Sequence, residues 1–75
     1  MKEQLMEILK NLRADVDFEN NKALIDNGDL ESLDIVALVG ELNDEFDVEI
    51  TVEHLTPENF NSVEAMMNLI TMLQE

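Results

Sequence analysis

One run of apolar residues at helical spacing limits what this chain can fold into. Five of its side chains lie at offsets of 0, +3, +4, +7 and +11: Ile35, Leu38, Val39, Leu42 and Phe46. Such offsets bring residues onto one side of an α-helix, so the pattern predicts a helix over residues 32–46 with a buried stripe. Ser32 stands where the N-cap of that helix belongs, and Asp34 suits its first turn.

Two further segments carry an apolar stripe of the same kind. One covers residues 3–14, with a stripe formed by Leu5, Ile8, Leu9 and Leu12. The other covers residues 62–73, with Asn61 and Glu64 as a variant capping box. Its stripe consists of Val63, Met66, Met67, Ile70 and Leu73. We interpret its methionines, Met72 included, as core filler.

The segments between these helices are read from their turn signals. A short helical turn is expected at residues 52–55, capped by Thr51, and Thr56-Pro57 is typical of a helix start. Residues 46–50 alternate like a strand, but no second clear strand exists to pair with them. We therefore interpret that segment as an extended connection that turns Val48 and Ile50 inward.

A long connection over residues 15–29 separates the first two helices, with a tight bend at Asn27-Gly28. The elements together predict an all-α fold, a small three- to four-helix bundle with a long loop between the first and second helices. At this length we expect one domain over residues 1–75.

Charge is distributed unevenly along the chain. The sequence has 18 acidic and 4 basic residues, for a net charge of −14, and no base follows Lys22. Such a surface repels phosphate backbones and anionic lipids, so neither nucleic acid nor a membrane is an expected partner. A basic protein surface is the natural partner, and like charges favour a monomer. Salt should stabilise the fold by screening this charge.

Several functional classes are excluded or disfavoured by composition. The chain has no cysteine, so it has neither a disulfide framework nor a thiolate metal site. Its first ten residues alternate charged and apolar side chains, unlike a signal peptide, and no apolar run approaches the length of a membrane span. We expect a compact cytoplasmic protein. An enzyme is not expected, because His54 is the only histidine and no paired carboxylates stand out.

Ser32 has two interpretations. It could simply end a loop and cap a helix. Alternatively, its position at a helix N-terminus, after a loop that contains Gly28, would suit a phosphoester, because backbone N–H groups and the helix dipole favour phosphate there. Asp29, Glu31 and Asp34 would then face the phosphate, so the modifying enzyme would have to bring cations.

The run from Ser32 to Ile50, SLDIVALVGELNDEFDVEI, resembles the second helix and following loop of acyl carrier proteins. Matching residues include Glu31-Ser32-Leu33-Asp34, Glu45-Phe46-Asp47 and Glu49-Ile50. The resemblance implies that a separate phosphopantetheinyl transferase, using magnesium, attaches 4′-phosphopantetheine from coenzyme A to Ser32. It also implies that the thiol of this arm holds acyl or aminoacyl groups as thioesters, loaded by a ligase and passed to acyl-transfer or synthase enzymes. The protein would be a carrier and not a catalyst.

Some positions differ from the fatty-acid carriers of that family. Glu31 replaces the usual Asp, Ala37 stands where Glu is usual, and Gly40 stands where Met is frequent. The segment over residues 51–61 is also longer. These features resemble stand-alone carriers of secondary metabolism, including polyketide and nonribosomal peptide synthesis, or D-alanyl carriers. They point away from a housekeeping role in fatty acid biosynthesis, and the cargo itself stays open.

A second apolar stripe on the Ser32 helix consists of Leu33, Val36, Ala37 and Gly40. It could be buried as part of a wide apolar arc. It could also be a docking face beside the arm, in which apolar residues anchor a partner and carboxylates steer it. The candidate docking residues are Glu31, Leu33, Asp34, Val36, Ala37, Gly40, Glu41 and Asp44. A sequestered acyl chain would enter near Phe46, Ile50 and Phe60.

Two alternatives of other classes remain at this point. Asp15, Asp17 and Glu19 alternate, with Asp26 at the twelfth position, but Asn20 stands where a calcium-binding EF-hand loop requires Gly. An acidic inhibitor, or decoy, that occupies a basic cleft would also suit the net charge. The decoy makes no demand on Ser32, so modification of that residue separates it from a carrier.

Overall fold

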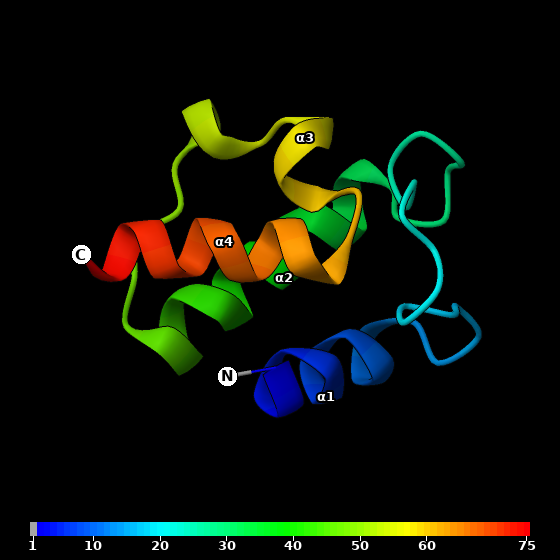
Figure 1. Cartoon of the computed structure of the whole chain (residues 1–75), viewed down its shortest axis with the longest axis horizontal. Coiled ribbons are helices and arrows are strands. Elements are labelled where there is room, and N and C mark those ends of the chain that lie inside the picture. The colour runs from blue at the N-terminus through cyan, green and yellow to red at the C-terminus, as the bar shows by residue number, and fades with distance from the viewer. Residues whose placement is uncertain (1) are drawn as a thin grey trace.

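The computed structural model describes residues 2–75, and every regular element in that range is a helix. In chain order these are α1 (Lys2–Leu12), α2 (Ser32–Phe46), the 3₁₀ helix η1 (Val52–His54), α3 (Pro57–Phe60) and α4 (Val63–Gln74). Figure 1 shows α2 and α4 running back against the direction of α1, with η1 and α3 along one edge of the bundle. The predicted all-α bundle is confirmed.

The long loop between α1 and α2 is held by buried apolar anchors. Phe18, Leu24 and Leu30 are each at most 2 % exposed. The bend at Asn27-Gly28 occurs as predicted: Gly28 has a φ of +79°, a value that glycine adopts at little cost, and its N–H donates to the carbonyl of Ile25.

The helix boundaries lie within two residues of the predicted ones. The first helix ends at Leu12 and not at residue 14, and the Arg13 N–H donates to the Leu9 carbonyl as the chain leaves it. The second ends at Phe46, as predicted, and its C-cap Asp47 adopts the left-handed conformation with φ 52° and donates its N–H to the Asn43 carbonyl. Beyond it, Ile50 is buried and Val48 partly buried, as expected of the extended connection.

Two predicted caps are wrong. Glu31, and not Ser32, is the N-cap of α2, because its extended backbone directs its N–H to the Asp34 carboxylate at 3.1 Å. Ser62, and not Asn61, caps α4, since its Oγ accepts the Ala65 N–H at 3.1 Å. The two predicted starts at Thr51 and Thr56-Pro57 do precede η1 and α3.

The core lies between α1, α2 and α4 and is closed by α3 and the long loop. Among the residues that the structure describes, fourteen apolar ones are buried in it: Leu5, Met6, Leu9, Phe18, Leu24, Leu30, Leu38, Leu42, Ile50, Phe60, Val63, Met66, Leu69 and Ile70. Met72 was predicted in this core but is 54 % exposed, because it lies in the last turn of α4, where little else covers it. None of the helices in residues 2–75 is long and apolar enough to cross a membrane.

Candidate functional site

Ser32 is the first residue of α2 and is exposed to solvent. Because Glu31 takes the capping position, the Ser32 hydroxyl is not needed to cap the helix. None of the hydrogen bonds within residues 2–75 involves that hydroxyl. Ser62, the other serine, is partly buried and uses its hydroxyl as a cap. Across the described part of the chain, Ser32 is therefore the one serine with a free hydroxyl.

An open groove of about 580 Å³ borders Ser32. Its lining comes from three parts of the chain, namely the end of the long loop, the first turn of α2 and the η1–α3 segment. The residues are Ile25, Leu30, Glu31, Ser32, Ile35, Val36, Leu55, Thr56 and Phe60. Most of these side chains are apolar, and Glu31 is the one charged group among them.

The groove differs from the entry point expected from the sequence. Phe60 lines it, but Phe46 and Ile50 do not. Phe46 lies at the opposite end of α2, roughly 20 Å from Ser32 along the helix axis at 1.5 Å per residue. Ile50 is committed to the core, where it is 6 % exposed. Ile25, Leu30 and Leu55 were not foreseen here, because only the folded loop and η1 bring them beside Ser32.

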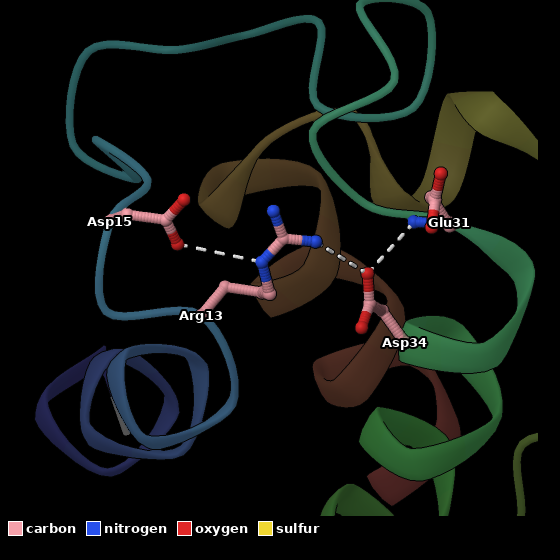
Figure 2. A network of polar contacts seen from close by, with 4 residues as sticks. All are labelled: Arg13, Asp15, Glu31 and Asp34. Carbon is pink, nitrogen blue, oxygen red and sulfur yellow. Dashed lines mark hydrogen bonds and ion pairs between the residues drawn. The ribbon is translucent and has the colours of Figure 1, made fainter.

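A small polar network anchors the turn that contains Ser32 (Figure 2). The Nη1 atom of Arg13 donates to Asp34 Oδ2 at 3.0 Å, and the same oxygen accepts the Glu31 N–H at 3.1 Å. The Nε atom of Arg13 contacts Asp15 Oδ1 at 3.5 Å. Asp34, predicted as part of the docking face, is thus directed toward Arg13 and is only 19 % exposed.

These contacts also affect the protonation equilibria of the network. Hydrogen bonds to Asp15 and then Asp34 raise the pKa of Arg13, so the guanidinium stays charged. The pKa of Asp15 is lowered, first by its own backbone amide and then by Arg13. Asn20 lowers the pKa of Asp17 by donating from its side chain and its backbone. All three groups therefore stay ionised at neutral pH.

The second apolar stripe of α2 faces solvent. Leu33 is 84 % and Val36 is 65 % exposed, while Ala37 and Gly40 are exposed as well. A Cβ atom built on Gly40 would meet no atom within 4 Å. Burial on a wide arc, one of the two interpretations of this stripe, is therefore wrong. Exposed carboxylates of Glu31, Glu41 and Asp44 accompany the stripe. Within residues 2–75, Asp34 is the candidate docking residue whose carboxylate forms an ion pair.

A sequence model of the family described as "Phosphopantetheine attachment site" matches residues 2–70. The chain belongs to this family. Its prosthetic group is covalent 4′-phosphopantetheine, and the chain is a carrier protein of the acyl carrier type. Domains of this kind are in general non-catalytic and interact with phosphopantetheinyl transferases and synthase enzymes. A comparison with curated proteins found no match.

Three of the four carboxylates considered for calcium have other partners in this carrier protein. Asp15 pairs with Arg13, Asp17 accepts from Asn20, and Asp26 accepts from the Asn61 side chain at 3.1 Å. Across residues 2–75 no three carboxylate or imidazole groups come together in a way that could hold a metal ion.

Sequence reasoning missed two residues that shape the site of the carrier protein, Arg13 and Asn61. Arg13 was assigned to the end of the first helix, and its pairing with Asp34 across 21 positions was not foreseen. A signal was present, because consecutive antiparallel helices bring the end of the first close to the start of the second. Asn61 was assigned to a cap, but it binds the long loop. His54 is partly buried, and its Nδ1 accepts the Thr51 N–H at 3.0 Å.

Proposed function

We propose that Ser32 is the residue that carries 4′-phosphopantetheine, and that the protein delivers acyl or aminoacyl groups between enzymes as thioesters of this arm. The observation that carries the proposal is the exposed Ser32 hydroxyl, which has no internal partner, at the first position of a 15-residue helix. The backbone N–H groups of a first helical turn favour a phosphate. When bound, the arm supplies the thiol that this chain lacks, since it has no cysteine.

The residues around Ser32 fit the attachment of an anionic phosphodiester. The carboxylate of Asp34 is paired with Arg13, and that of Asp29 accepts a hydrogen bond from the Asn21 side chain. Glu31 is the remaining exposed acid next to Ser32. Repulsion between Glu31 and phosphate is the reason to expect that the transferase brings a divalent cation such as magnesium to this site.

The lining of the groove also supports the proposal, because it suits the acyl or aminoacyl group that the arm would hold. Its apolar lining suits the contact of an acyl group with Ile35, Val36 and Leu55. Its one charged residue, Glu31, is an acid, which also suits the ammonium group of an aminoacyl cargo. Both cargo classes therefore belong to the proposal, and a D-alanyl or other aminoacyl carrier is the second form of it.

The exposed stripe of α2 supports a docking role beside the arm. Leu33 and Val36 offer apolar contact area, and Glu41 and Asp44 offer negative charge to steer a basic surface. We propose that the transferase, the loading ligase and the synthase enzymes approach over this face with basic surfaces. Repulsion between such acidic chains supports a monomer, and cytoplasmic enzymes of this kind would place the carrier in the cytoplasm.

Mass spectrometry tests the attachment site. Apo protein incubated with coenzyme A, magnesium and a promiscuous phosphopantetheinyl transferase should gain one phosphopantetheine mass, and Ser32→Ala should abolish the gain. Since Ser32 is not the N-cap, Ser32→Ala should keep the wild-type stability within about 0.5 kcal/mol. The matched control Ser62→Ala removes a real cap and should cost about 1 kcal/mol, yet remain fully modified.

Two outcomes would contradict the proposal. One is an unchanged wild-type mass under conditions in which a control carrier is modified, which would favour the acidic decoy. The other is a mass gain that persists in a folded Ser32→Ala protein, which would place the arm on another hydroxyl.

A further inference from the structure

Arg13 forms an ion pair that joins two distant parts of the chain. It follows the last residue of α1, and its partner Asp34 is the third residue of α2. The side chains are 32 % and 19 % exposed, so the pair is partly shielded from water. Within residues 2–75, every ion pair involves Arg13. The other bases, Lys10 among them, are exposed and form none in that range.

The paired carboxylate also holds the backbone next to Ser32. Asp34 Oδ2 accepts both Arg13 Nη1 at 3.0 Å and the Glu31 N–H at 3.1 Å. Figure 2 shows the Asp34 carboxylate between the Arg13 guanidinium and the Glu31 backbone N–H. Arg13 therefore orients the carboxylate that fixes the residue immediately before Ser32.

The turn needs such an anchor because a long loop precedes it. Residues 13–31 contain no helix and include the bend at Gly28, so no preceding helix fixes where α2 begins. The Leu30 N–H is bonded to the Leu24 carbonyl at 3.0 Å, a contact within the loop itself. The Arg13–Asp34 pair instead connects the start of α2 directly to the end of α1.

We infer that Arg13 is a positioning residue for the modification of Ser32, acting through Asp34 to hold the first turn of α2 in the orientation that a transferase meets. The inference rests on the proposed attachment at Ser32. It predicts that loss of the Arg13 charge slows modification although Arg13 is not part of the acidic docking face. A charged, partly buried hydrogen bond contributes more than an exposed one, so the effect should be measurable.

The test compares Arg13→Gln with the matched control Lys10→Gln, which changes the net charge equally at an exposed residue. The kcat/KM for phosphopantetheine transfer should fall about fivefold for Arg13→Gln and less than about twofold for Lys10→Gln. Arg13→Lys keeps the charge near Asp34 and should recover at least half of the loss. All rates are measured well below the melting temperature of each variant, so that a loss of folded protein is excluded.

Two measurements distinguish positioning through Asp34 from an effect of the lost positive charge that does not involve Asp34. Hydrogen exchange of the Glu31 amide should speed up in Arg13→Gln and not in Lys10→Gln. In an Asp34→Asn background, Arg13→Gln should slow transfer by less than about twofold, because the partner through which it acts is already altered. Two results would overturn the inference. One is an equal kcat/KM for Arg13→Gln and Lys10→Gln. The other is a double variant whose fold decrease in kcat/KM equals the product of the decreases caused by Arg13→Gln and Asp34→Asn alone.

Failure of this inference can be told from failure of the proposed attachment. If wild-type protein gains no phosphopantetheine, the proposed function fails, whatever the Glu31 amide shows. If wild type is modified and Arg13→Gln matches its control in rate and in Glu31 exchange, only the positioning role fails.

Discussion

Asn61 attaches the long loop to the junction of α3 and α4. Its Oδ1 accepts the N–H groups of Ile25 and Asp26 at 2.9 and 3.1 Å, and its Nδ2 donates to Asp26 Oδ2. Its backbone carbonyl accepts the Leu24 N–H at 2.9 Å. Since Ile25 lines the groove beside Ser32, Asn61 helps to shape that groove from a distance.

We predict that Asn61→Ala lowers the free energy of unfolding by about 2 kcal/mol. Three hydrogen bonds are lost, each with a net value near 1 kcal/mol, but the two that join Asp26 are exposed and water can partly replace them. Urea denaturation measures the change. Asn68→Ala is the control: Asn68 is exposed on α4, and its replacement should change stability by less than about 0.5 kcal/mol. Equal effects of the two substitutions would show that Asn61 does not hold the loop.

The residue types predicted the chemistry of the site better than they predicted which side chains form hydrogen bonds with one another. The type and place of Ser32 indicated a modification, but its assignment as a cap was wrong, because Glu31 directs its N–H to Asp34. Asn61 was expected to cap α4 and instead binds residues 35 and 36 positions earlier in the chain. A polar side chain near a turn has several possible hydrogen-bond partners, and the folded structure determines which of them it contacts.

At the scale of elements, α2 has one stripe in the core and another in solvent. Leu38 and Leu42 are fully buried, whereas Leu33 and Val36 are mostly exposed. Both stripes are apolar and both have helical spacing. The periodicity therefore predicted the helix itself, with its start and end, but not which stripe is covered. Packing against α1 decides that question.

Gly40 allows the stability and the docking role of α2 to be tested separately. Gly40→Ala should raise the free energy of unfolding by about 1 kcal/mol, because glycine is less favourable than alanine inside a helix. No atom lies within 4 Å of the new Cβ, so the substitution causes no steric clash. Gly40→Gln should also fold, yet it places a longer side chain on the exposed face. We expect roughly a tenfold lower kcat/KM for phosphopantetheine transfer with Gly40→Gln.

Asn68→Gln, a neutral change at an exposed site on α4, serves as the control for docking. Its transfer rate should equal that of wild type. A wild-type rate for stable Gly40→Gln protein would mean that the transferase does not approach over this face. A drop in stability for Gly40→Ala would show that Gly40 has a packing partner.

At the scale of the whole molecule, charge opposes the fold. Residues 23–75 hold 13 acidic side chains and no base, and Arg13 reaches across to pair with one of these acids. A single partly exposed ion pair contributes about 1 kcal/mol or less. Repulsion among the remaining acids acts over many pairs, so it should outweigh this gain at low ionic strength.

We therefore predict that salt stabilises the protein. Between about 20 mM and 500 mM NaCl the Debye length shrinks severalfold, and the melting temperature should rise by about 5 °C, equivalent to roughly 1 kcal/mol for a domain of this size. Thermal unfolding followed by circular dichroism measures it, and KCl should act equally if screening is the cause. A falling melting temperature would mean that ion pairs such as Arg13–Asp34 dominate the electrostatics.

The local features of this protein follow from short stretches of its sequence. Helical periodicity predicted α1, α2 and α4 to within two residues, and Thr56-Pro57 and Gly28 marked the start of α3 and a bend. The resemblance of the run from Ser32 to Ile50 to acyl carrier proteins indicated a carrier. Each of these patterns involves residues close together in the sequence, so it can be recognised before the fold is known. Other features depend on the fold. Folding brings Arg13 to Asp34 and Asn61 to the long loop, leaves the Leu33 stripe in solvent and assembles the groove from three segments. Such contacts form between residues far apart in the chain, because the packed helices fold the long loop back, and no local spacing of residues encodes that path.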